Sequence, residues 1–165
     1  NSDTTLPRRI GLRRMREADW QFIALGTGQP RLEESLRRLE RDFPERVRVE
    51  VAYDAQLARQ IYAGADALLM PSRYEPCGLA QMIAMRYGCI PVVSAVGGLT
   101  DTVKDGATGF VMGRPTSARL VAALNRTARV YADSQLWASM QIAAMAQDFS
   151  WTSSAAFSMS LALLT

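Results

Sequence analysis

The stretch "PSRYEPCGLAQMIAMRYGCIPVV", residues 71–93, carries the strongest indication of the fold. A short apolar run, Asp66 to Met70, precedes it, and a second apolar run closes it at 90–94. Between the two runs lies a helix-like segment that ends at Gly88. One carboxylate, Glu75, sits in the tight Pro-Glu-Pro-Cys-Gly turn where the first run ends. The pattern predicts a buried strand, a turn, a helix and a second buried strand.

The same alternation continues along the rest of the chain. We expect strands at 20–26, 46–51, 66–71, 90–94 and 108–112, and helices at 31–43, 55–65, 78–88, 98–103, 117–131 and 134–147, with a last helix-like segment after 149–151. Asp54 is the expected N-cap of the second helix. Strand–helix alternation with short connections predicts an α/β fold with a doubly wound parallel sheet. Ligands of such sheets bind beyond the carboxyl ends of the strands.

Composition limits the possible functions. The chain has 165 residues, 48% hydrophobic and 21% charged, with a net charge of +3, which is typical of one globular domain. Its basic and acidic side chains are intermixed, so we expect no nucleic-acid partner. The chain contains no histidine, which excludes a Ser-His-Asp triad, a Cys-His dyad and a histidine-bearing zinc site. Two scattered cysteines and the lack of a long apolar segment favour a cytoplasmic location without a membrane anchor.

Two glycine-bearing turns follow predicted strands. Gly26 and Gly28 close the first strand, and Gly97 and Gly98 precede a short helix. Such turns let backbone N–H groups approach an anion at a helix N-terminus, although most glycines at strand–helix turns are purely structural. The dinucleotide fingerprint G-x-G-x-x-G is absent, because Arg31 stands where its third glycine belongs.

Three further side chains at strand ends have more than one interpretation. Glu75 either complements the helix dipole or presents a carboxylate to a polar ligand, where it could support a developing positive charge. Cys77 has no histidine or lysine nearby to activate it, so a packed, partly buried thiol is favoured over a nucleophile. Tyr53 is either a core aromatic or a ring that stacks on a base.

Together these segments resemble the carboxyl-terminal domain of glycogen and bacterial starch synthases. The resemblance covers residues 20–151 and rests on "LGTGQPRLEESL", "IYAGADALLMPSRYEPCGLAQMIAMRYGCIPVV", "GGLTDTV", "TGFV" and "AQDFSW". It implies the GT-B fold, in which two Rossmann-like domains face a cleft. This chain would be the carboxyl-terminal half without its first strand, with a nucleotide-sugar domain at 1–148 and a helix at 149–165 that crosses to the amino-terminal domain.

The resemblance also implies a retaining transfer of glucose from ADP-glucose to the non-reducing end of an α-1,4-glucan, without a metal or another cofactor. Glu75 matches the family's functional glutamate beside the donor sugar. Cys77, Gly78 and Leu79 match the loop near the sugar and the phosphates, and Tyr53 matches the aromatic residue against adenine. The matching residues of the second loop, beside the sugar and the distal phosphate, are Gly97, Gly98 and Leu99.

Several positions depart from the family pattern and keep two alternatives open. Ala80 replaces a hydroxyl residue, and Ser94 and Val96 resemble relatives that use a UDP- or GDP-sugar. The Arg-and-Lys loop that clamps the diphosphate has no counterpart in residues 1–19, which leaves a non-catalytic nucleotide- or glucan-binding scaffold as the other alternative. We expect a fragment that needs an amino-terminal GT-B domain for activity. The apolar tail residues Phe157, Leu161 and Leu164 are the expected face for docking to it.

Overall fold

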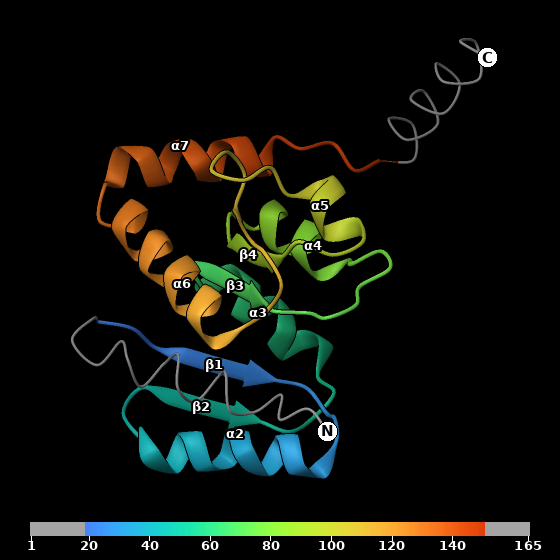
Figure 1. Cartoon of the computed structure of the whole chain (residues 1–165), viewed down its shortest axis with the longest axis vertical. Coiled ribbons are helices and arrows are strands. Elements are labelled where there is room, and N and C mark those ends of the chain that lie inside the picture. The colour runs from blue at the N-terminus through green and yellow to red at the C-terminus, as the bar shows by residue number, and fades with distance from the viewer. Residues whose placement is uncertain (1–18, 151–165) are drawn as a thin grey trace.

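The computed structural model describes residues 19–150 as an α/β fold of short parallel strands and covering helices (Figure 1). In chain order the elements are β1 (Phe22–Leu25), α2 (Pro30–Asp42), β2 (Val47–Glu50), α3 (Ala55–Gly64), β3 (Ala67–Met70), α4 (Ala80–Arg86), β4 (Ile90–Ser94), α5 (Gly98–Thr102), β5 (Phe110–Met112), α6 (Ser117–Tyr131) and α7 (Ser134–Met145). Every strand and helix expected between residues 20 and 147 is present, with most boundaries shifted by one or two residues. The helix-like segment expected after 149–151, with Phe157, Leu161 and Leu164, lies outside the described residues.

Side-chain caps explain where three of the helices begin. The Asp54 carboxylate accepts hydrogen bonds from the backbone N–H groups of Gln56 and Leu57, as the sequence predicts. Asp133 caps α7 in the same way, and the Thr116 hydroxyl accepts from the Arg119 N–H at the start of α6. Each cap satisfies backbone donors that have no partner inside the helix.

The strands form two parallel sheets. β1 pairs with β2, and the order in the second sheet is β3-β4-β5. All pairs are parallel, as expected, but within residues 19–150 no ladder joins β1 to β3. Among the described residues the predicted parallel sheet, expected without its first strand, is divided between β1 and β3, and Figure 1 shows β1 on the side of the small sheet that is nearer to β3.

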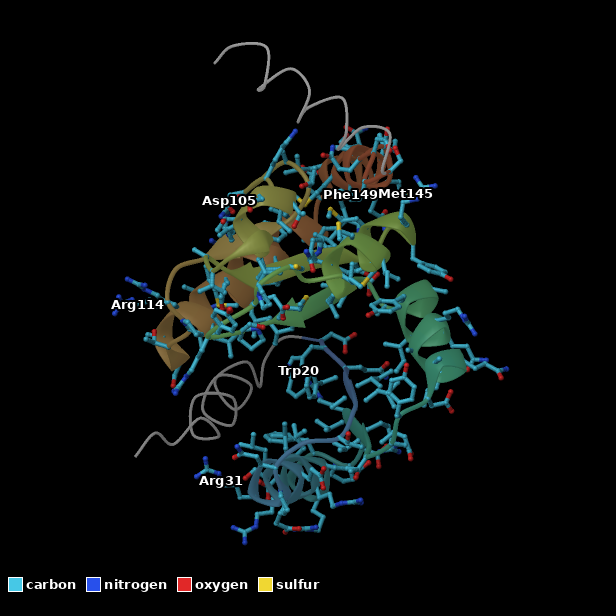
Figure 2. All side chains as sticks on the ribbon, turned by 90° about the vertical axis from the view of Figure 1, so that its right-hand side faces the viewer. Trp20, Arg31, Asp105, Arg114, Met145 and Phe149 are labelled. Carbon is cyan, nitrogen blue, oxygen red and sulfur yellow. The ribbon has the colours of Figure 1, made fainter. Side chains whose placement is uncertain are left out.

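Each sheet has its own core. The larger core surrounds β4, whose five residues are all buried, and includes Phe110, Leu99 and Trp137. The smaller core is formed by Leu39 and Val47 with partly buried neighbours. Leu124 of α6 packs against both cores and so connects the two sheets. Figure 2 shows this division, with Arg31 in the half built by α2 and with Asp105 and Met145 in the other half.

Candidate functional site

The loop between β3 and α4 holds Glu75 by its own backbone. The Gly78 N–H donates to Glu75 Oε1 over 3.2 Å, and the Glu75 side chain is half-buried. Gly78 is buried with a φ of +65°, a backbone conformation that favours glycine. The carboxylate thus lies at the carboxyl end of β3, fixed before the helix begins at Ala80. The Glu75 carboxylate therefore accepts its hydrogen bond from a backbone N–H group of the loop, and not from one in the first turn of α4.

The loop after β4 lies directly against this first loop. A Cβ atom on Gly97 would overlap the Glu75 carbonyl oxygen, and one on Gly98 would overlap the Cys77 carbonyl oxygen. Gly97 also has a positive φ of +48°. The two glycines are required here because backbone packs against backbone. The structure therefore brings together two groups of predicted site residues, Glu75 to Leu79 and Gly97 to Leu99.

A buried glutamine that was not predicted from the sequence connects these two loops. Gln81 of α4 is fully buried, and its Nε2 donates to the Gly78 carbonyl over 2.6 Å and to Thr102 Oγ1 over 3.0 Å. The Thr102 hydroxyl in turn donates to the Gly98 carbonyl over 2.8 Å. The same Nε2 also donates to the Cys77 carbonyl over 3.4 Å, and these two carbonyl acceptors indicate which end of the amide is the nitrogen. The sequence offered one indication of this role, because Gln81 is a polar residue on the buried face of the predicted helix.

The chemical surroundings of the two cysteines differ. Cys77 is exposed, which corrects the prediction of a packed, partly buried thiol. Its backbone carbonyl lies against Gly98 of the second loop. Cys89 is fully buried, and this burial, together with the charge of Asp66, raises the pKa of its thiol to about 12. Because the thiolate is the nucleophilic form, Cys89 has no nucleophilic role near neutral pH.

The two leucines of the predicted site have opposite environments. Leu79 is 67% exposed immediately before α4, so its side chain is available to a ligand. Leu99 is fully buried in the larger core, so only its backbone can face a ligand. Ser94, one of the positions that depart from the family pattern, is also buried, and its hydroxyl has no partner among residues 19–150.

The remaining predicted site residues lie at the carboxyl ends of β1 and β2. The Gly26 N–H donates to the Glu50 carbonyl over 3.1 Å, which joins the two strand ends. The Gly28 N–H donates to the Glu33 carboxylate over 2.7 Å, so its anion-binding capacity is used by an acid in the first turn of α2. Tyr53 is 93% exposed, which excludes the interpretation as a core aromatic. No hydrogen bond between described residues joins this pair of loops to the Glu75 loop.

Two further findings for residues 19–150 bear on other kinds of site. No group of three His, Cys, Asp or Glu side chains in this part of the chain is placed to hold a metal ion. None of its helices has both the length and the apolar character needed to cross a membrane. That the reaction needs no metal or other cofactor stays a prediction.

Comparison with known proteins gives one consistent family. Residues 8–129 match the family model described as "Glycosyl transferases group 1". The chain is 47% identical over 133 residues to a glycogen synthase of Thermodesulfovibrio yellowstonii and 48% identical over 140 residues to the soluble starch synthase 2-2 of Oryza sativa subsp. japonica. Each alignment covers 81% of this chain, but only 27% and 20% of the respective relative.

A solved structure agrees with this result. The catalytic domain of starch synthase IV from Arabidopsis thaliana, determined with ADP and acarbose bound, superposes with a TM-score of 0.76 at 32% sequence identity. The alignment covers 93% of this chain and 35% of that domain. The predicted fold, one half of a GT-B glycosyltransferase, is confirmed by this neighbour and by the parallel strands.

Proposed function

This chain belongs to the group 1 glycosyl transferases, and from that membership we propose that it is the donor-binding domain of an ADP-glucose-dependent glucan synthase. The full-length enzyme would move glucose to the non-reducing end of an α-1,4-glucan with retention of configuration. The chain spans 27% of the glycogen synthase that it matches, so activity is proposed for the longer enzyme and not for these residues alone.

The observation that carries the proposal is the backbone contact between the Glu75 loop and the Gly97–Gly98 turn. It places a half-buried carboxylate and a positive-φ glycine turn together at the carboxyl ends of β3 and β4. Parallel α/β sheets bind their ligands at these ends. The comparisons support the choice of ligand, because the relatives are glycogen and starch synthases and the starch synthase IV structure contains ADP.

In the transfer, the bond between the sugar's anomeric carbon and a diphosphate oxygen breaks, and ADP leaves with that electron pair. A glucan hydroxyl forms the new bond to the same carbon and gives its proton to the departing phosphate. Positive charge develops on the sugar in between, as in other glycosyl transfers. We assign to Glu75 the stabilisation of that charge, and to the amides around Gly97 and Gly98 the binding of the sugar and the distal phosphate.

Calorimetric titration with ADP, ADP-glucose and UDP tests the proposal. We expect weak binding, with ADP favoured over UDP and ADP-glucose favoured over ADP. Glu75→Gln should remove the preference for ADP-glucose over ADP, while Glu45→Gln, an exposed carboxylate outside the site, should retain it.

Two results would contradict the proposal. Equal binding of UDP and ADP would favour the UDP-sugar alternative, which Ala80 at the start of α4 also motivates because it offers no hydroxyl to a phosphate. No binding of any nucleotide by a folded chain would favour the non-catalytic scaffold.

A further inference from the structure

The solvent-facing side of α4 is largely apolar, which is unusual for a surface helix. From the N-cap Leu79 to the C-cap Tyr87, the exposed residues are Leu79, Ile83, Arg86 and Tyr87. Surface helices normally turn polar residues to water and apolar residues to the core. In α4 this arrangement is partly reversed, because Gln81 is fully buried while Leu79, Ile83 and Tyr87 are 67%, 42% and 44% exposed. Packing of the core gives no reason for this exposed apolar stripe.

The three apolar residues lie one above another on α4. The Ile83 N–H donates to the Leu79 carbonyl over 3.0 Å, and the Tyr87 N–H donates to the Ile83 carbonyl over 3.3 Å. Residues four apart share one face of a helix, and at a rise of about 1.5 Å per residue the stripe is about 12 Å long. It begins next to Gly78, in the loop that holds Glu75, and leads away from the candidate donor site.

Two tyrosines form the far end of the stripe. The rings of Tyr62 of α3 and Tyr87 have centroids 6.2 Å apart and planes inclined by 22°, which makes an offset, nearly parallel pair. Tyr62 is partly buried, so its contact orients the Tyr87 ring, part of which stays open to solvent. A ring already held in place loses little conformational entropy when a ligand packs against it.

The stripe is neutral and narrow. The only charged side chain of α4 is Arg86, and its Nη1 donates to the Met145 carbonyl over 3.0 Å, at the end of α7. A row of leucine, isoleucine and tyrosine side chains therefore suits an uncharged ligand. Four partly exposed side chains present roughly 400 Å², about half of the 800 Å² or so that each partner buries in a stable protein interface. The area favours a smaller or thinner ligand than a protein.

We propose that this stripe, formed by Leu79, Ile83, Tyr87 and Tyr62, binds a linear α-1,4-glucan outside the donor site. A glucose ring has an apolar C–H face and a rim of hydroxyls, so the face packs on the stripe while the hydroxyls stay in water. The two inclined rings suit the curved α-1,4 chain better than an extended β-1,4 chain. The choice of glucan rests on the proposed function, because a second contact on the acceptor polymer raises the effective concentration of its reacting end at the Glu75 loop.

NMR titration of the full chain with maltoheptaose, a linear α-1,4-glucan, tests this inference. We expect saturable shifts in the signals of Leu79, Ile83, Tyr87 and Tyr62. Cellohexaose, which contains the same sugar in β-1,4 linkage, is the matched control ligand, and we expect it to bind more weakly.

Three variants and one control variant locate the binding. Tyr87→Ala should weaken maltoheptaose binding roughly fivefold, the effect of losing one stacked ring, while Tyr87→Phe keeps the ring and should bind as the parent does. Ile83→Glu leaves both tyrosines in place and should also weaken binding, because the added carboxylate must lose water when a sugar covers it. It keeps the test decisive if the loss of the tyrosine pair impairs folding. Tyr131→Ala, the control, removes a ring that is 50% exposed at the end of α6 and should leave the Kd unchanged.

Separate titrations with maltoheptaose and with ADP distinguish this inference from the proposed function. Maltoheptaose binding by a chain that binds no nucleotide would support the glucan site and contradict the donor site. ADP binding without any maltoheptaose shift at Ile83 and Tyr87 would do the reverse.

Four results overturn the glucan site. Shifts confined to residues 75–79 would mean that the sugar contacts only the donor loop. Equal affinity for cellohexaose would contradict recognition of an α-1,4 chain, and an unchanged Kd in both Tyr87→Ala and Ile83→Glu would place the glucan elsewhere. Line broadening at Ile83 and Tyr87 that disappears on dilution, with no effect of the sugar, would identify a second copy of this chain as the occupant of the stripe.

Discussion

Gln81 Nε2 lies 3.0 Å from Thr102 Oγ1, and this contact connects the loop after β3 to the helix after β4. The bond continues through the Thr102 hydroxyl to the Gly98 carbonyl, so one buried amide sets the distance between the two loops that form the candidate site. These hydrogen bonds explain why Gln81 is buried, without any contact between its side chain and a ligand.

Replacing Gln81 should therefore loosen both loops. We expect Gln81→Met to lower the free energy of unfolding by about 1–3 kcal/mol, because buried acceptors lose their donor. Hydrogen exchange at Gly78 and Leu99 should accelerate together. Gln135→Met, at an exposed glutamine of α7, is the control and should change stability by less than about 0.5 kcal/mol. Acceleration in one loop only would show that the amide does not couple them.

Gly97→Ala should be far more damaging than Gly28→Ala. A methyl group on Gly97 meets the Glu75 carbonyl oxygen in a backbone conformation with φ of +48°, whereas one on Gly28 meets nothing within 4 Å. The combined overlap and strain should cost at least about 2 kcal/mol, measured by urea denaturation. Equal stability of the two variants would contradict the backbone contact between the loops.

Tyr53→Ala should reduce ADP affinity without affecting stability. The ring is 93% exposed, so its removal leaves no cavity. If it stacks on adenine, its loss should cost about 1–3 kcal/mol of binding, which is roughly a fivefold to 150-fold increase in Kd. Tyr53→Phe keeps the aromatic face and should bind as the parent does. Unchanged Kd for Tyr53→Ala in a chain that binds ADP would place the base elsewhere.

We expect the buried Cys89 thiol to lower the free energy of unfolding as the pH rises above 9. The folded state holds the pKa of this thiol at about 12 instead of 9.0, so between these values the folded chain retains a proton that the unfolded chain releases. Unfolding is then favoured by about 1.4 kcal/mol for each pH unit above 9. Cys89→Ala, compared with the parent by urea denaturation at pH 8 and pH 10.5 under reducing conditions, should lack this component. If both proteins lost the same free energy of unfolding between pH 8 and pH 10.5, the contribution of Cys89 would be contradicted.

The local elements were predictable because each has its own signal in the sequence. Asp54 before an apolar helical pattern marked the start of α3, and the run 90–94 coincides with β4. Both depend on neighbours in sequence, either through capping or through apolar periodicity. The positions of Glu75 and of Gly97 at strand ends followed from the same local patterns.

What could not be predicted depends on contacts between distant segments. The pairing of Gly97 with the Glu75 carbonyl and the burial of Gln81 both arise where two loops meet in three dimensions. The division of the sheet between β1 and β3 is likewise a matter of strand order, to which hydrophobic patterns are insensitive. The exposed Cys77 was mispredicted for this reason, since exposure depends on which side of the loop the partner backbone occupies.

The difference in exposure between the Cys77 and Cys89 thiols allows a spectroscopic label to be attached at one of them selectively. Near neutral pH an alkylating dye should react with Cys77 alone, because Cys89 is shielded and almost entirely protonated. A fluorophore or a fluorinated tag could thus be attached two residues from Glu75 without engineering any new cysteine. Nucleotide addition could then be followed as a change in emission or chemical shift, even where the heat of binding is too small for calorimetry.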